Sequence, residues 1–95
     1  MPEKHLVSVR LGQTFEIGEP SNPTTGHTWT ANYDPTLLEL RQQKFEKSSK
    51  ATGAGGLQKF TFVAKRKGKG MLRLVYHRPW ENSPLRQSDY EIVVE

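Results

Sequence analysis

The chain of 95 residues contains no cysteine. This absence excludes disulfide bonds, cysteine-ligated zinc, iron–sulfur clusters and a cysteine nucleophile. Long apolar runs are also missing, and no stretch approaches the roughly 20 residues of a membrane-spanning helix, so we expect no membrane partner. The charged start, residues 1–5, leads into no signal-peptide-like run. We therefore expect a cytoplasmic protein, or a secreted or periplasmic one if a leader was removed.

The sequence offers little for catalysis or metal binding. Its three histidines, His5, His27 and His77, are scattered without the spacing of metal ligands. No serine lies in a nucleophile-elbow sequence, and no two carboxylates are placed for acid–base chemistry. We expect no enzyme activity, no bound metal and no cofactor.

The composition fits one small globular domain. With 34% hydrophobic and 25% charged residues, the chain can bury one modest core, so we predict a single domain over residues 1–95 and a monomer. Fourteen Lys and Arg against ten Asp and Glu give a net charge of +4. A positive net charge this small favours solubility but does not indicate a particular partner.

Apolar residues alternate with a period of two along most of the chain, which predicts β-strands separated by Gly- and Pro-rich turns. One helical turn, capped by Asp34 at residues 35–40, is an alternative at a single place. We predict an all-β protein, an immunoglobulin-like β-sandwich of about seven to eight strands, with Trp29 in the core on the third strand. The predicted strands cover residues 5–11, 13–18, 27–32, 37–46, 57–66, 70–78 and 87–95.

Three of the predicted loops belong to the same end of such a sandwich. Because consecutive strands run alternately up and down, every second connection emerges at one end. These connections, residues 19–26, 47–56 and 78–87, are the longest and the most unusual in composition. We therefore expect a binding surface at this end.

The first two loops carry different kinds of motif. Asn22-Pro23-Thr24-Thr25-Gly26 is stiffened by its proline and two β-branched threonines, and its glycine can take a positive φ; an ordinary turn without a partner is the alternative. Gly53-Ala54-Gly55-Gly56 is either a flexible tether or a backbone that approaches an extended segment of a partner. No Lys-Ser/Thr pair follows it, which argues against a phosphate-binding loop.

Arg78-Pro79-Trp80 places two residue types typical of interface hot spots in a loop stiffened by proline. Two interpretations stay open for Trp80. It either anchors a partner or folds back as a lid over the end of the core.

In this order, the three motifs resemble the three signature loops of the chagasin family of cysteine-protease inhibitors, and the strand spacing agrees over nearly the whole chain. The resemblance implies reversible, non-covalent, tight-binding inhibition of papain-like proteases (clan CA, family C1), such as papain and cathepsin L-like enzymes. It places the first motif over the catalytic Cys and His, the second in the unprimed cleft and the third on the primed side. The protease-binding residues would be Asn22, Pro23, Thr24, Thr25, Gly26, His27, Gly53, Ala54, Gly55, Gly56, Arg78, Pro79 and Trp80.

His27 departs from the family pattern, which often has an aromatic residue after the first motif. We expect this histidine to alter how the first loop is supported, and to add a pH dependence if it lies near the cleft.

Two other functions compete with inhibition. An immunoglobulin-like binding or adhesion module would use the same loops on another protein. A polyanion-binding protein would use the basic residues of the fifth strand and its hairpin, but these lie mostly at the opposite end, and Phe60 and Phe62 face the predicted core instead of stacking on bases. We expect no nucleic-acid partner. The basic residues concerned are Lys59, Lys65, Arg66, Lys67 and Lys69.

Overall fold

The computed structural model describes residues 3–22, 25–47, 55–81 and 83–95. Every predicted strand is found, shifted by at most three residues at either end. The strands are β1 (Glu3–Val9), β2 (Thr14–Ser21), β3 (Thr28–Asn32), β4 (Leu38–Lys47), β5 (Gly56–Ala64), β6 (Gly68–His77) and β7 (Arg86–Val94). No helix long and apolar enough to cross a membrane occurs in these ranges.

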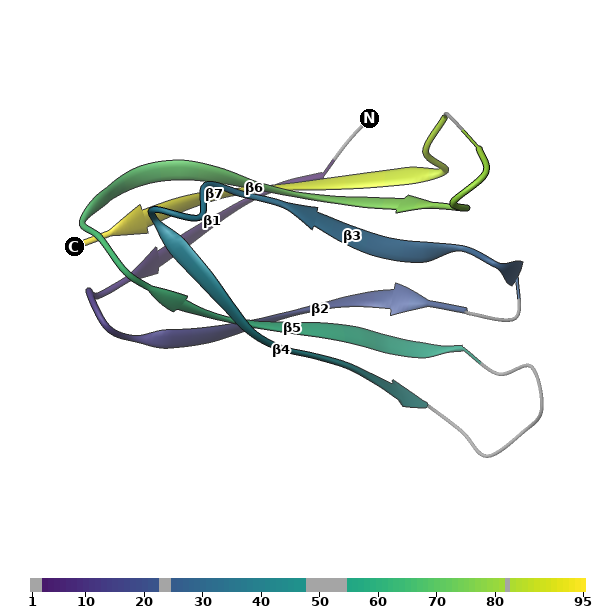
Figure 1. The fold of residues 1–95 in the computed structure, drawn as a ribbon, viewed down its shortest axis with the longest axis horizontal. Coiled ribbons are helices and arrows are strands. Elements are labelled where there is room, and N and C mark those ends of the chain that lie inside the picture. The colour runs from purple at the N-terminus through teal and green to yellow at the C-terminus, as the bar shows by residue number, and fades with distance from the viewer. Residues whose placement is uncertain (1–2, 23–24, 48–54, 82) are drawn as a thin grey trace.

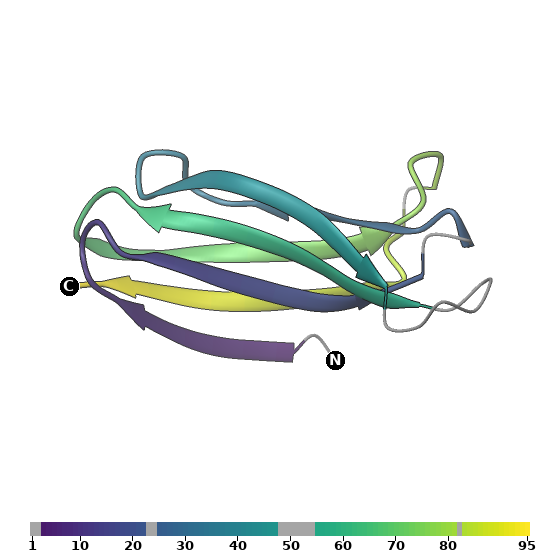
Figure 2. The ribbon, with the colours of Figure 1, turned by 90° about the horizontal axis from the view of Figure 1, so that it is seen from below.

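The strands form two sheets that pack face to face as an immunoglobulin-like sandwich (Figure 1). One sheet has the order β1-β7-β6-β3 and the other the order β2-β5-β4. β1 runs parallel to β7, whereas all other neighbours are antiparallel. Figure 2 shows the strands of both sheets following one long axis, as expected for aligned sheet packing.

The core lies between the sheets and follows the alternation seen in the sequence. Trp29, Phe60 and Phe62 are each at most 2% exposed, so the predicted core positions of all three are confirmed. Phe62 packs between Phe15, whose ring centre lies 5.7 Å away, and Tyr33, which meets it edge-on at 5.1 Å. Burying a side chain of this size contributes about 1.5–3 kcal/mol.

The connection between β3 and β4 is a turn and not a helix. Asp34 caps it: Oδ1 accepts from the Thr36 N–H at 2.8 Å, and the Asp34 carbonyl accepts from the N–H groups of Leu37 and Leu38, each at 3.0 Å. Leu37 and Leu38 are fully buried, and β4 begins at Leu38. Packing of these two leucines in the core therefore ends the turn before a helix can form.

The strand directions sort the connections into two groups (Figure 1). The ends of β2, β4 and β6 and the starts of β3, β5 and β7 lie at one end of the sandwich. The β1–β2, β3–β4 and β5–β6 turns lie at the other end, with the C-terminus. The three longest connections therefore leave the sandwich at the same end, as the alternation of strand direction predicts.

Candidate functional site

The β2–β3 connection is a compact turn held by its own backbone. The Asn22 carbonyl accepts hydrogen bonds from the Thr25 N–H at 3.2 Å and from the Thr25 hydroxyl at 2.9 Å. Gly26 has a φ of 82°, in the left-handed region that favours glycine. Pro23 and Thr24, which belong to the same motif, lie outside the described residues.

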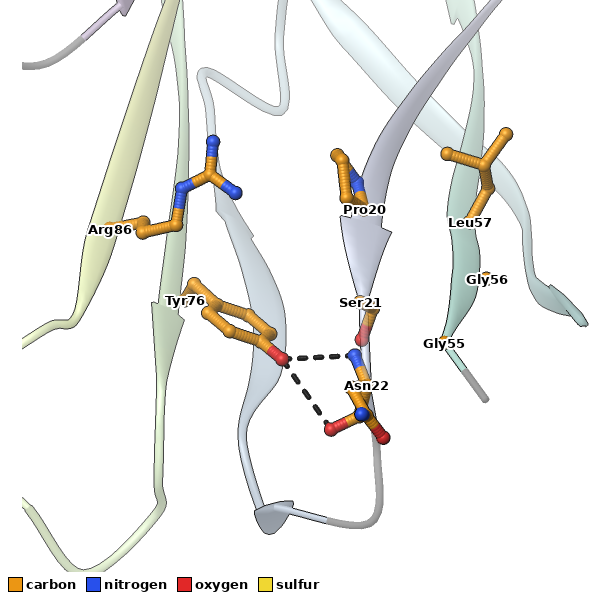
Figure 3. A pocket seen from close by; sticks show the side chains of 8 residues that line it. All are labelled: Pro20, Ser21, Asn22, Gly55, Gly56, Leu57, Tyr76 and Arg86. Atoms are coloured by element: carbon orange, nitrogen blue, oxygen red, sulfur yellow. Dashed lines mark hydrogen bonds between the residues drawn. The ribbon is translucent and has the colours of Figure 1, made fainter. Parts of the chain in front are cut away.

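Two core aromatics fasten the base of this turn. The Tyr76 hydroxyl accepts from the Asn22 N–H at 3.0 Å and donates to the Asn22 carbonyl at 3.5 Å (Figure 3). The Trp29 indole N–H donates to the Pro20 carbonyl at 2.9 Å. Because both rings are buried, the turn is attached directly to the hydrophobic core.

Tyr76 also supports His27. Its ring stacks on Tyr76 with 5.1 Å between ring centres, and its Nδ1 lies 2.9 Å from the Thr25 hydroxyl. The imidazole thus makes a flat contact of the kind an aromatic side chain would make, and adds a polar contact to the turn.

Arg78 joins the β6–β7 connection to the β2–β3 turn. Its Nε donates to the Thr25 carbonyl at 2.9 Å, and its Nη1 pairs with Glu81 Oε1 at 2.9 Å. The guanidinium also lies over the Trp80 ring, 6.0 Å from the ring centre, within range of a cation–π contact. One side chain therefore holds parts of two motifs in a fixed relation.

Trp80 points away from the core. It is 72% exposed, so the lid interpretation is wrong. The edge of its indole packs against Gly26, where an added Cβ would lie only 3.1 Å from the Trp80 Cη2. Pro79, between Arg78 and Trp80, is exposed as well. The connection therefore presents a large apolar surface beside the first motif.

The β4–β5 motif is described only in part, because Gly53 and Ala54 lie outside the described residues. A Cβ on Gly56 would lie 2.0 Å from the Glu46 carbonyl oxygen, and one on Gly55 would lie 3.1 Å from that of Ser21. Close backbone approach therefore explains both glycines, and the neighbour is this chain's own backbone.

Three basic residues of β5 and the β5–β6 turn have partners within the domain. Lys59 contacts Glu46 at 2.8 Å; this hydrogen-bonded pair raises the pKa of Lys59 and lowers the pKa of Glu46. Arg66 pairs with Asp34 at 3.4 Å, and Lys65 donates to the Pro35 carbonyl at 2.9 Å. The β5–β6 turn lies at the end opposite the β6–β7 connection (Figure 1).

The side chains described at this end of the molecule suggest binding of a partner and not metal-dependent chemistry. Within the described ranges, no three His, Asp or Glu side chains gather as a metal site would require. The residues brought together by hydrogen bonds and packing are Asn22, Thr25, Gly26, His27, Arg78 and Trp80, with Tyr76 as their support.

The chain matches the model of the family described as "Chagasin family peptidase inhibitor I42" over residues 8–94. The chain belongs to this family. It is 34% identical over 80 residues to Chagasin of Trypanosoma cruzi, covering 78% of this chain and 73% of that protein. It is 28% identical over 91 residues to Amoebiasin-2 of Entamoeba histolytica, covering 90% and 74%.

Solved structures show the same fold. The cysteine protease inhibitor EhICP2 of Entamoeba histolytica matches with a TM-score of 0.80 and 23% identity, covering 98% of this chain and 96% of that one. PbICP-C, solved in complex with falcipain-2, matches with a TM-score of 0.77 and 18% identity, covering 100% and 90%. The family resemblance carried by the motifs is thus confirmed, and this chagasin-family chain is a peptidase inhibitor and not an enzyme.

Proposed function

We propose that this protein inhibits papain-like cysteine proteases (clan CA, family C1) by inserting its β2–β3, β4–β5 and β6–β7 connections into the active-site cleft. Binding is reversible, tight and non-covalent. The observation that carries the proposal is the unit in which Arg78 binds Thr25 while the exposed Trp80 packs on Gly26. A structural relative bound to falcipain-2 supports the same class of partner.

The geometry of the β2–β3 turn suits an inhibitor better than a substrate. A papain-like site holds a thiolate beside an imidazolium and binds the scissile carbonyl oxygen of a substrate through donors of its own. Here the Asn22 and Thr25 carbonyls already accept hydrogen bonds from Thr25 and Arg78. These carbonyls are therefore held by the inhibitor and are not offered to the enzyme.

The attachment of the turn to the core lowers the entropic cost of binding. Tyr76 and Arg78 fix the backbone of the turn before the protease arrives, so little freedom is lost on association. A nanomolar complex requires about 12 kcal/mol, which a standard interface of about 1,600 Å² with a few anchors supplies. Trp80 is the anchor that this surface offers, being large, rigid and exposed.

A titration tests the proposal. Recombinant protein is added to papain, to a cathepsin L-like enzyme and, as a control, to trypsin. We expect stoichiometric loss of activity in the two cysteine proteases only, with recovery on dilution and an intact inhibitor by mass spectrometry. A folded sample that leaves both enzymes active would overturn the proposal and favour an adhesion module that uses the same loops on another ligand.

The same assay separates inhibition from polyanion binding. A variant that carries Lys65→Gln, Arg66→Gln, Lys67→Gln and Lys69→Gln removes the positive charge at the end opposite the three connections. We expect its inhibition constant to stay within about twofold of the wild-type value, because surface charge this distant is screened at physiological salt.

A further inference from the structure

Gln58 is a polar residue at an inward position of β5, on the same face of the strand as Phe60 and Phe62. Its side chain crosses the space between the two sheets and reaches β3. Oε1 accepts from the Trp29 N–H at 3.1 Å, and Nε2 donates to the Trp29 carbonyl at 2.9 Å. The Thr28 hydroxyl also donates to Oε1, at 3.4 Å. One amide therefore binds both backbone groups of a residue in the opposite sheet.

The Gln58 amide takes the place of a neighbouring strand. β3 lies at the edge of its sheet and pairs with β6 on one side only. A primary amide offers a donor and an acceptor side by side, as the backbone of a paired strand does. Because an unsatisfied backbone group at a part-buried position is costly, the amide both satisfies the edge of β3 and ties β3 to β5.

The bridge belongs to a closed set of contacts directly below the β2–β3 turn. Gln58 of β5 binds the Trp29 backbone of β3, and the Trp29 indole N–H donates to the Pro20 carbonyl of β2. β2 in turn pairs with β5, with Glu19 opposite Gln58. Three strands from both sheets are therefore joined at the place where the first motif leaves β2 and enters β3.

The three motifs are attached to different sheets (Figure 1). The β4–β5 connection joins two strands of one sheet, the β6–β7 connection joins two strands of the other, and the β2–β3 connection crosses between the sheets. The bond from Arg78 to Thr25 holds the β6–β7 connection to the β2–β3 turn. The position of both relative to the β4–β5 connection depends on how the sheets are held together at this end, where Gln58 lies near the start of β5.

We propose that Gln58 is a positioning residue for protease inhibition. Its amide fixes β3 against β5, and so holds the β2–β3 turn and Trp80 in place relative to the β4–β5 connection. The inference rests on the proposed function and adds a residue that lies outside all three motifs. A protease cleft contacts the three connections at once, so a shift of one sheet against the other weakens binding even where each connection keeps its own conformation.

The first test replaces the amide by an apolar side chain of similar length. Gln58→Met removes both hydrogen bonds to Trp29, and we expect the inhibition constant against papain to rise about tenfold. Gln58→Leu makes the same change with a shorter side chain and replaces Gln58→Met if that variant does not fold. Melting temperatures show which variants are folded.

Two controls accompany this variant. Gln13→Met removes another glutamine amide that accepts from a backbone N–H, that of Arg10 at 2.9 Å, in the β1–β2 turn at the opposite end. Ile92→Val removes a methylene group from a fully buried core side chain and so lowers stability without changing the bridge. We expect both controls to inhibit within about twofold of the wild type. A control that is impaired as strongly as Gln58→Met would overturn the proposal.

The second test separates positioning from a general loss of stability. Trp80→Ala is combined with Gln58→Met, and inhibition constants of the wild type, both single variants and the double variant complete a double-mutant cycle. In the described part of the chain, Gln58 makes its hydrogen bonds to Thr28 and Trp29 and none to the β6–β7 connection. Without a positioning role, the two effects therefore multiply.

We expect Trp80→Ala to raise the inhibition constant by about 30-fold in the wild type, but by less than about tenfold in Gln58→Met. The difference arises because an indole that is already displaced has less contact with the protease to lose. Effects that multiply to within about twofold would overturn the positioning role.

Hydrogen–deuterium exchange at the Trp29 amide measures the bridge without any protease. We expect exchange to be at least about tenfold faster in Gln58→Met, since Oε1 accepts this N–H in the wild type. An unchanged exchange rate would overturn the bridge. If the bridge is observed but the wild type inhibits neither papain nor the cathepsin L-like enzyme, the proposed function fails. Normal wild-type inhibition, with Gln58→Met within about twofold of it, overturns only the positioning role.

Discussion

Gly26 has a left-handed backbone conformation and also contacts side chains of the third motif, so Gly26→Ala is the most informative single change. The residue has a φ of 82°, and a Cβ placed on it would lie 3.1 Å from Trp80 Cη2 and 3.8 Å from Arg78 Nε. An alanine therefore strains the turn and also pushes on the two side chains that connect it to the β6–β7 connection.

The two effects have different sizes and different readouts. The left-handed conformation costs an alanine about 1 kcal/mol relative to glycine, which lowers the melting temperature of a domain of this size by roughly 4–8 °C. The displacement of Trp80 acts on binding, because the indole is exposed and belongs to no core contact that the melting temperature reports. We expect the inhibition constant against papain to rise by about tenfold, equivalent to about 1.4 kcal/mol.

Gly12→Ala is the matched control. Gly12 has nearly the same φ, 85°, in the β1–β2 turn at the opposite end, and nothing lies within 4 Å of an added Cβ. The assay measures melting temperature and inhibition constant for both variants. We expect similar losses of melting temperature, with inhibition impaired in Gly26→Ala alone.

If Gly26→Ala inhibits within about twofold of the wild type, binding through Trp80 does not depend on the contact between Trp80 and Gly26. If Gly12→Ala impairs inhibition as strongly as Gly26→Ala, the loss follows from lower global stability and not from the loop contact.

Trp80→Ala should raise the inhibition constant by about 30-fold or more, as for the loss of an anchor worth about 2 kcal/mol. Its melting temperature should be nearly unchanged because the ring is 72% exposed. A large fall in melting temperature together with the loss of inhibition would contradict this. Tyr76→Phe keeps the ring but removes the hydroxyl that binds the Asn22 backbone, so we expect a loss of about 1 kcal/mol in the free energy of unfolding and weaker inhibition, with Tyr33→Phe as control. The pKa of Asp34 is lowered by its hydrogen bonds to Thr36 and by Arg66. The unfolded state therefore binds a proton at Asp34 more readily than the folded state. The contribution of Asp34 to stability is present at neutral pH and is lost as the pH falls below about 4. Asp34→Asn should therefore flatten the acid side of the plot of melting temperature against pH, and an unchanged slope would exclude the carboxylate as its source.

The fold was predictable because its signals are local. The alternation of apolar residues places Phe60, Phe62 and Trp29 on the inner faces, and the structure buries all three. Strand direction then assigns the loops to one end, which follows from topology without any contact being known. The parallel pairing of β1 with β7 joins strands at opposite ends of the chain, and no local pattern specifies it.

The organisation of the site was less predictable, because it depends on contacts between distant residues. Arg78 and Thr25 are 53 positions apart, and Tyr76 and Asn22 are 54 apart. Tyr76 occupies an ordinary core position in the sequence pattern, and only the structure shows that its hydroxyl reaches the β2–β3 turn. The exposure of Trp80 is of the same kind, since the sequence allowed both a lid and an anchor.

His27 shows how a departure from the family pattern is accommodated. Its ring keeps a stacked contact with Tyr76, so the support of the turn does not require a hydrocarbon ring. The Thr25 hydroxyl has one proton, which it donates to the Asn22 carbonyl at 2.9 Å, and it lies 2.9 Å from His27 Nδ1. Both contacts are hydrogen bonds at once only when His27 carries a proton on Nδ1 and donates. The turn therefore favours a proton on Nδ1, and a phenyl ring at this position would keep the stacking but remove the donor.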